Sequence, residues 1–192
     1  WNGTNWVEVN DLTTARQQLA GCGTNTAAVA FGGGTPSVTG KTENWNGTCW
    51  SETNDMTTSR LLLAGSGIYT SALAYGGLEP SVSAKTESWN GSSWTEVSDL
   101  NAGRYNWQGI GASNTSALAA AGYTGTANSG LVEEWNGTAW TETTNVSDDG
   151  NAYGAAGTAE AALISGGNGR SPNASSEAWT SPVKTTVTFT AS

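Results

Sequence analysis

The chain of 192 residues repeats one pattern four times, and this internal repeat constrains the fold more than any other feature. A tryptophan that precedes a turn recurs every 44 to 46 residues, and a second tryptophan follows it after five residues. An arginine and a glycine pair recur at the same period. Repeats of this length are typical of folds whose units cannot bury their apolar faces alone and therefore stack on their neighbours.

Composition narrows the classes of protein that such a repeat can form. The chain holds 26 glycines and only 12% charged residues, which suits many short strands joined by tight turns. The net charge of -9 argues against nucleic acid and anionic membranes as partners, because both require clustered lysine and arginine. No apolar run reaches the roughly 18 residues of a membrane-spanning helix, so we expect no membrane insertion.

Each repeat contains the pattern of four short strands. In the repeat 16–60, an apolar segment ends at Gly32-Gly33, and Asn46-Gly47 separates two further strand-like segments. Asn-Gly between strand residues is the strongest short hairpin signal, because both turn positions need positive φ. Four antiparallel strands in a unit of this length predict a propeller blade. The expected strands are residues 17–23, 27–31, 41–45 and 48–53.

A two-residue turn at Asn46-Gly47 also predicts how its flanking strands pair. Trp45 then lies opposite Thr48, and Glu43 lies opposite Trp50. Since these residue types recur at fixed repeat positions, we interpret them as structural. The structural positions are Trp45, Trp50, Trp89, Trp94, Trp135, Trp140, Arg16, Arg60, Arg104, Glu43, Glu87 and Glu133.

The order of these motifs resembles the kelch repeat over essentially the whole chain. The motifs that carry the resemblance are AVAFGG (28–33), TENWNGTCW (42–50) and NDMTTSR (54–60). The chain departs from kelch in placing tryptophan where that repeat usually has tyrosine. The resemblance implies an all-β, kelch-like β-propeller of four-stranded antiparallel blades, a fold that mostly serves as a binding scaffold.

We expect one β-propeller domain over residues 1–192. Its predicted parts are a half-blade (1–15), three repeats (16–60, 60–104 and 104–150) and a degenerate C-terminal repeat (150–192), with an outer strand at 184–191. Because 1–15 supplies only a third and a fourth strand, we expect the polypeptide to extend upstream, giving five blades or more. The alternative is a four-bladed ring in which 1–12 completes the blade begun by 150–167.

The titratable residues argue against catalysis. The chain has no histidine, which excludes catalytic triads and metal sites that depend on an imidazole. Asp11, Asp55 and Asp99 recur five residues before each arginine, so they either accept backbone hydrogen bonds or pair with that arginine. Cys22 and Cys49 are expected to be free thiols. We predict no enzyme activity, no cofactor and no metal. Catalysis by a pair of carboxylates, as in glycosidases, is the least favoured alternative.

The copies differ most in the loops that share one face of such a propeller. Positions free to differ are candidates for contact with a ligand, because scaffold positions repeat. Trp107 is the one tryptophan outside the repeat template, and it either stacks on a ligand or fills a gap in the central channel. The candidate ligand face comprises Tyr105, Asn106, Trp107, Tyr123 and Arg170.

These observations favour a non-catalytic binding or structural module. The hairpins WNGTNW, WNGTCW, WNGSSW and WNGTAW resemble those of phage and viral structural proteins. That resemblance implies a virion surface or tail protein used for host attachment or decoration, with other virion proteins or a host glycan or receptor as partners, and homo-oligomers possible. The alternative is a carbohydrate-binding propeller lectin, extracellular or on a cell surface, and less favoured is a glycan-active hydrolase.

Overall fold

The computed structural model describes residues 3–169 and 174–181, and within them the fold is all-β with no helix. Three four-stranded antiparallel sheets and one three-stranded sheet follow one another along the chain. We call these sheets units 1 to 4. The predicted fourth strand of the last repeat, 184–191, lies outside the described residues.

Units 1 and 2 have the same strand order. Unit 1 consists of β1 (Ala20–Gly23), β2 (Ala28–Phe31), β3 (Thr42–Trp45) and β4 (Trp50–Glu52). Unit 2 consists of β5 (Ala64–Ile68), β6 (Ser71–Tyr75), β9 (Thr86–Trp89) and β10 (Trp94–Val97). Between β6 and β9, the loop of unit 2 forms a small ribbon from β7 (Leu78–Glu79) and β8 (Ser81–Val82).

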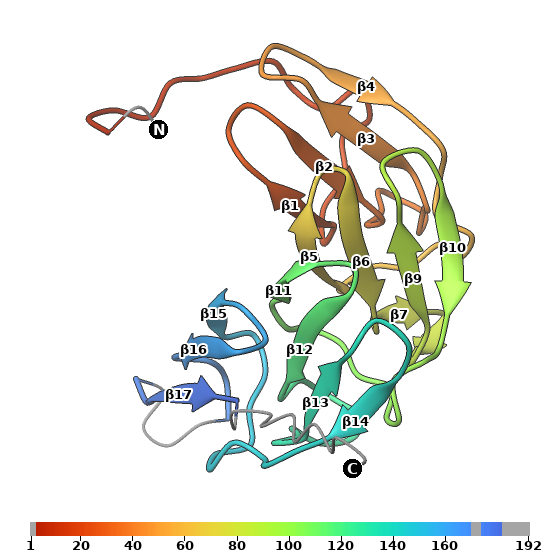
Figure 1. Cartoon of the computed structure of the whole chain (residues 1–192). Helices are drawn as coiled ribbons and strands as arrows, with labels where there is room; N and C mark the ends of the chain where they lie inside the picture. The colour runs from red at the N-terminus through yellow and green to blue at the C-terminus, as the bar shows by residue number, and fades with distance from the viewer. Residues whose placement is uncertain (1–2, 170–173, 182–192) are drawn as a thin grey trace, which may run out of the picture.

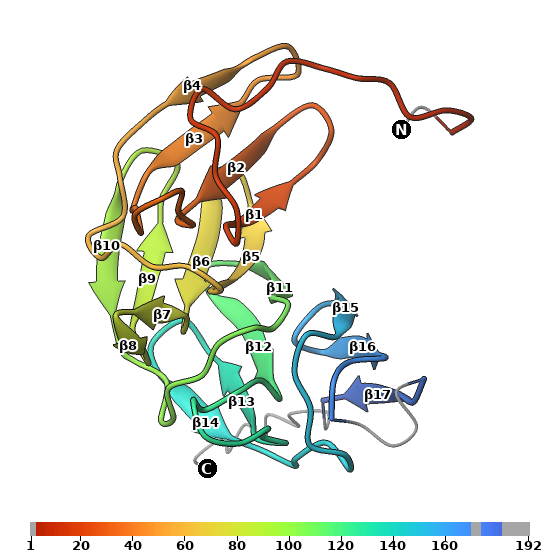
Figure 2. The ribbon, with the colours of Figure 1, turned by 180° about the vertical axis from the view of Figure 1, so that it is seen from behind.

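Units 3 and 4 continue the series. Unit 3 consists of β11 (Ile110–Ser113), β12 (Ser116–Ala120), β13 (Val132–Trp135) and β14 (Trp140–Glu142). Unit 4 consists of β15 (Gly154–Gly157), β16 (Ala161–Ser165) and β17 (Ser176–Thr180). The first strands lie along the inside of an arc of four sheets, and the arc remains open between units 1 and 4 (Figures 1 and 2). This arrangement is compatible with the blades of a β-propeller.

The predicted hairpin register was wrong by two residues. Trp45 pairs with Trp50 and Glu43 pairs with Glu52, so four residues, 46–49, connect the strands. The reason is the side chain of Asn46, whose Oδ1 accepts hydrogen bonds from the backbone nitrogens of Thr48 and Cys49, both at 2.9 Å. Only Gly47 has positive φ, +91°, so the turn is an Asx-stabilised loop rather than a two-residue turn.

The predicted strands of the N-terminal half-blade are also not formed. Residues 3–15 contain no strand, and Trp6 is 84% exposed. Third and fourth strands pair only when a second strand offers its edge, and no described strand lies beside this segment (Figure 1). The segment therefore has the sequence of outer strands without the sheet that would hold them.

Neighbouring units pack through the second tryptophan of each repeat. Trp94 of unit 2 lies edge-on against Phe31 of unit 1, with ring centroids 4.7 Å apart, and its Nε1 donates to Thr42 Oγ1 at 2.9 Å. Trp140 of unit 3 makes the same hydrogen bond to Thr86 of unit 2, at 3.0 Å. Each of these two interfaces thus places the tryptophan of one unit against an aromatic ring and a threonine hydroxyl of the unit before it.

A buried ion pair joins the arginine and the glutamate of each complete repeat. Arg60 Nη2 lies 3.0 Å from Glu87 Oε1, and both side chains are fully buried. The same pair recurs as Arg16–Glu43 at 2.9 Å and Arg104–Glu133 at 2.6 Å. Burial lowers the pKa of the Arg60 guanidinium, and the Glu87 carboxylate opposes that shift. The pair is therefore part of the core.

Each arginine also ties two strands together through their carbonyl groups. Arg60 Nη1 donates to Gly76 O at 2.8 Å and to Lys85 O at 2.6 Å, where the second strand ends and the third begins. The second oxygen of Glu87 accepts the backbone nitrogen of Thr57 at 2.7 Å, which fixes the loop that enters the unit. One ion pair thus positions the entry loop and the two middle strands of the sheet.

The recurring aspartates accept backbone hydrogen bonds, which was the first of the two predicted roles. Asp55 Oδ1 accepts from Thr42 N, and Asp99 Oδ1 accepts from Thr86 N, both at 3.2 Å. The arginines pair with the glutamates instead. Asn145 takes the aspartate position in unit 3 and accepts from Val132 N at 3.3 Å. Asn145 can replace the aspartate because this contact requires only an oxygen that accepts a hydrogen bond.

The two cysteines are free thiols, as predicted. Cys22 lies on β1, and Cys49 lies in the loop before β4. Burial raises the pKa of the Cys22 thiol to about 12, so this group stays protonated at neutral pH.

Removing the charge of one buried glutamate tests the role of the ion pair. We expect Glu87→Gln to lower the free energy of unfolding by about 3 kcal/mol, because it leaves the buried Arg60 guanidinium without its counter-charge. Urea unfolding followed by tryptophan fluorescence measures this change. Glu52→Gln is the control, since the exposed Lys41–Glu52 pair contributes little. Equal losses in the two variants would contradict the role of burial.

The glycine pairs provide a second stability test. Gly76 has φ of +66°, and a Cβ there would lie 2.4 Å from Arg104 O. Ala121 takes the same position in unit 3 with φ of +55°, where the next unit has Gly150 in place of arginine. We expect Gly76→Ala to cost at least about 1–2 kcal/mol and Ala121→Gly to be neutral or stabilising. Thermal unfolding of the two variants decides this, and a destabilised Ala121→Gly would refute the strain argument.

Candidate functional site

A polar hollow lies where the loops of units 3 and 4 meet. Its lining residues come from four loop segments: the entries to β11 and β15, and the connections that follow β12 and β16. These loops belong to the face that the sequence predicted to vary between copies. The hollow is lined by Tyr105, Asn106, Tyr123, Thr126, Ala127, Asn128, Asn151 and Asn168.

Two tyrosines form one wall of this hollow. Tyr105 and Tyr123 exchange backbone hydrogen bonds in both directions, each at 3.0 Å. Their rings pack edge to face, with centroids 5.4 Å apart and an interplanar angle of 82°. The backbone pairing holds the two residues side by side, and their rings in contact form a wall with aromatic faces and phenolic hydroxyls.

Three asparagines form a hydrogen-bonded chain along the floor. Asn106 Nδ2 donates to Asn151 Oδ1 at 2.9 Å, and Asn151 Nδ2 donates to Asn128 Oδ1. Asn151 is only 5% exposed, and its backbone exchanges two hydrogen bonds with Asn168, at 3.1 and 2.8 Å. The side chain of Asn151 thus makes one hydrogen bond through its oxygen and one through its nitrogen, which orients the amides on either side of it.

The remaining polar atoms of these side chains are available to a ligand. In the described part of the chain, no partner meets Asn106 Oδ1, Asn128 Nδ2 or the side-chain amide of Asn168. Together with the two tyrosine hydroxyls they provide both donors and acceptors. No lining residue carries a formal charge, so the hollow suits a neutral, hydroxyl-rich ligand rather than an ion.

The five residues predicted for the ligand face do not all lie together. Tyr105, Asn106 and Tyr123 line the hollow. Trp107 does not: it is 6% exposed and lies between units 2 and 3, 4.7 Å from the Arg104 guanidinium carbon and 5.7 Å from the Tyr75 ring. Trp107 therefore packs in the core between two units rather than at the hollow. Arg170 lies outside the described residues.

Three asparagines of the hollow were not in the predicted set. Asn128, Asn151 and Asn168 stand where other copies have Val38, Gln17 and Gly34. The signal that could have found them was present, because the copies hold different residues at these positions. What the sequence did not supply was the knowledge that loops of two units converge at one junction.

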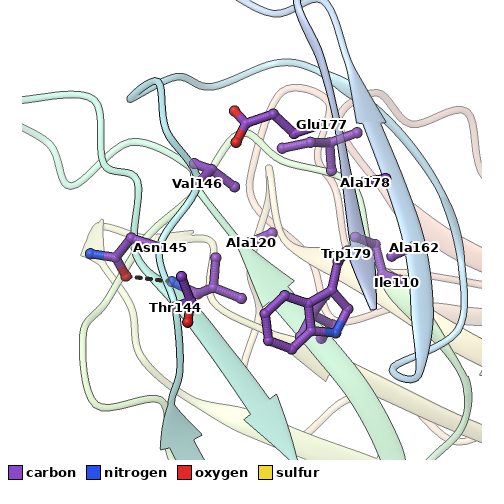
Figure 3. Close-up of a pocket in the computed structure, with 12 residues that line it drawn as sticks. Ile110, Ala120, Thr144, Asn145, Val146, Ala162, Glu177, Ala178 and Trp179 are labelled. Carbon is purple, nitrogen blue, oxygen red and sulfur yellow. Dashed lines mark hydrogen bonds between the residues drawn. The ribbon is translucent and has the colours of Figure 1, made fainter. Parts of the chain in front are cut away.

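A second hollow lies between the sheets of units 3 and 4 and is mostly apolar. Figure 3 shows Trp179 of β17 and Ile110 of β11 along it, with Val146 and Ala120 nearby. Leu118, Val132, Ala162 and Ile164 complete its apolar lining. At the two preceding junctions, the corresponding interface holds Trp94 or Trp140.

The described residues provide no sign of a metal centre or of a membrane helix. No group of three or more metal-ligating side chains occurs among them. No helix in that part of the chain is long and apolar enough to cross a membrane. Comparison with known protein families finds no model that matches the chain, and comparison with curated proteins finds no significant match.

Proposed function

We propose that the chain is a non-catalytic binding module whose units are blades of a kelch-like β-propeller, and that the polar hollow binds a neutral glycan. The repeated Arg–Glu pairs and the stacked sheets support the propeller interpretation, since each unit buries one face on its neighbour. A scaffold of this kind holds its loops rigidly. Rigid loops are what a small polar site requires.

The glycan proposal rests on two features of the hollow, the hydrogen-bonded asparagines and the two packed tyrosine rings. Sugars offer alternating donors and acceptors together with apolar C–H faces. The free amide atoms of Asn106, Asn128 and Asn168 match the hydroxyl groups, and the edge-to-face tyrosines present a surface for the C–H groups. Binding at such a site costs little side-chain conformational entropy, because the hydrogen bonds of Asn151 already orient the neighbouring amides.

The setting that we propose is the surface or tail of a phage or viral particle, where the module serves host attachment or decoration. The repeated WNGTxW hairpins, which resemble those of phage and viral structural proteins, support this setting. Electron microscopy of the particle tests it, since density for the arc of sheets is expected on the surface. A free or cell-surface lectin is the second candidate, and it shares the same hollow.

The geometry of the carboxylates favours binding over hydrolysis. Hydrolysis of a glycosidic bond uses two carboxyl groups on opposite sides of the bond. The hollow has no carboxylate among its lining residues, and Glu43, Glu87 and Glu133 are buried in ion pairs. A glycan held at this hollow therefore meets no acid or base pair from those residues.

A glycan array followed by calorimetry tests the proposal. We expect Tyr105→Ala and Asn168→Ala each to weaken binding about tenfold, because each removes about one hydrogen bond or its equivalent in contact. Gln17→Ala is the matched control, since Gln17 holds the repeat position of Tyr105 in unit 1. Absence of any glycan binding, or equal weakening by the control, would refute the assignment of the hollow.

A further inference from the structure

We propose that the polar hollow holds the sugar of a glycoconjugate, and that an apolar patch beside it on unit 2 holds an aliphatic group attached to that sugar. The proposal rests on the glycan site described above and narrows its ligand class to glycosides with an aliphatic aglycone. It follows from a graded series of side chains that crosses the face of the arc on which the hollow lies.

Each unit carries on this face one pair of residues that exchange two backbone hydrogen bonds. The pair joins the chain that enters the first strand to the loop that follows the second strand, and the bonds measure 2.8 to 3.3 Å. We call these pairs the rim pairs. In the order of the units they are Gln17–Gly34, Leu61–Leu78, Tyr105–Tyr123 and Asn151–Asn168. The same backbone geometry therefore presents a different kind of side chain in each unit.

The rim pairs of neighbouring units lie next to each other. The residue after the first member of each pair bonds to its counterpart in the next unit. Asn106 N donates to Leu62 O at 3.0 Å, and Ala152 N donates to Asn106 O at 2.7 Å. From unit 2 to unit 4 the series thus runs from aliphatic side chains through aromatic rings to amides.

The aliphatic end of this series forms a patch of four side chains at the surface. All four are partly exposed, and among the described residues neither cluster of the hydrophobic core includes them. Leu63, their neighbour in the sequence, is 4% exposed and belongs to the core. A contiguous apolar surface of this kind is typical of a contact site. The apolar patch consists of Leu61, Leu62, Leu78 and Val82.

The ribbon of β7 and β8 turns the patch toward unit 3. Leu78 pairs with Val82 and Glu79 pairs with Ser81, so one side of the ribbon is apolar and the other is polar. A Cβ at Gly125, in the loop of unit 3, would lie 2.8 Å from Val82 Cγ2. The apolar side therefore borders the loop that carries one tyrosine of the wall. Unit 2 has a neighbouring unit on each side, so the patch is not an end face of the arc (Figure 1).

The next junction has the same loop contact with a polar residue in it. A Cβ at Gly169, in the loop of unit 4, would lie 1.7 Å from Asn128 Nδ2. Asn128 holds the position of Val82, because the serine that follows each of them donates at 2.9 Å to the glycine at the start of its loop. One arrangement of loops thus gives an apolar surface between units 2 and 3 and the polar hollow between units 3 and 4.

The tyrosine wall connects the two surfaces. On one side of Tyr105 and Tyr123 lie the amides of the hollow, and on the other side lies the apolar patch. A free sugar in the hollow leaves the patch in water, whereas an aliphatic group attached to that sugar removes apolar area from water. A ligand that spans the three rim pairs therefore has hydroxyl groups at one end and methylene groups at the other.

Calorimetry with alkyl glycosides of increasing length tests the proposal. The probes are the methyl, butyl and hexyl glycosides of glucose, galactose and mannose, each below its micelle concentration. We expect the series of at least one sugar to bind, with an affinity that rises about thirtyfold from methyl to hexyl. A fully buried methylene gives about fourfold, and we expect about twofold per methylene because the patch is only partly enclosed.

A variant of the leucine pair separates the patch from the hollow. Leu61→Gln introduces the residue that unit 1 has at this position. It should bind the methyl glycoside like the unaltered chain, while the gain from methyl to hexyl falls to about threefold or less. Ile68→Gln is the matched control, because Ile68 is 47% exposed at the other end of β5, and it should keep the full gain. Circular dichroism checks that both variants are folded.

A variant of the hollow should act differently. Asn168→Ala should weaken the methyl and hexyl glycosides equally, about tenfold, because it removes a contact to the sugar alone.

The outcomes distinguish the patch from the glycan site. Methyl and hexyl glycosides that bind equally would overturn the patch and leave glycan binding in the hollow intact. A full gain in Leu61→Gln would contradict the patch in the same way. Hexanol that binds as tightly as a hexyl glycoside would contradict the link between the patch and the hollow. If none of the glycosides binds, both the patch and the glycan site are wrong.

Discussion

The buried Arg–Glu pair is the contact on which the rest of each unit depends. The guanidinium of Arg60 meets one carboxylate and two strand-end carbonyls, while the second oxygen of Glu87 binds the entry loop. A charge buried so completely requires its counter-charge, so the pair favours one arrangement of loop and strands. Unit 4 has Gly150 instead of the arginine, although Glu177 still binds the backbone of Ser147 at 2.7 Å.

That constraint explains where the chain is free to differ between copies. Because the Arg–Glu pair holds the ends of the second and third strands together, the loops that connect the strands need not do so. The asparagines of the polar hollow lie in those loops, at the junction where the fourth arginine is missing. At this junction, where Gly150 holds the arginine position, Asn151 forms amide hydrogen bonds with Asn106 and Asn128. The candidate site therefore stands at the one junction that is built differently.

Sequence alone predicted features that repeat in every copy. It missed features that depend on a single side chain or on loops of two units meeting at one place. The four-strand unit follows from periodicity, because the same pattern recurs in each copy. Periodicity also marked Asp55 and Asp99, but it left open whether they bind the backbone or the arginine. The hairpin register did not follow, since it depends on an Asn46 side chain that lengthens the turn. Trp107 was placed among ligand residues because it leaves the template, yet a residue can leave the template to fill the core.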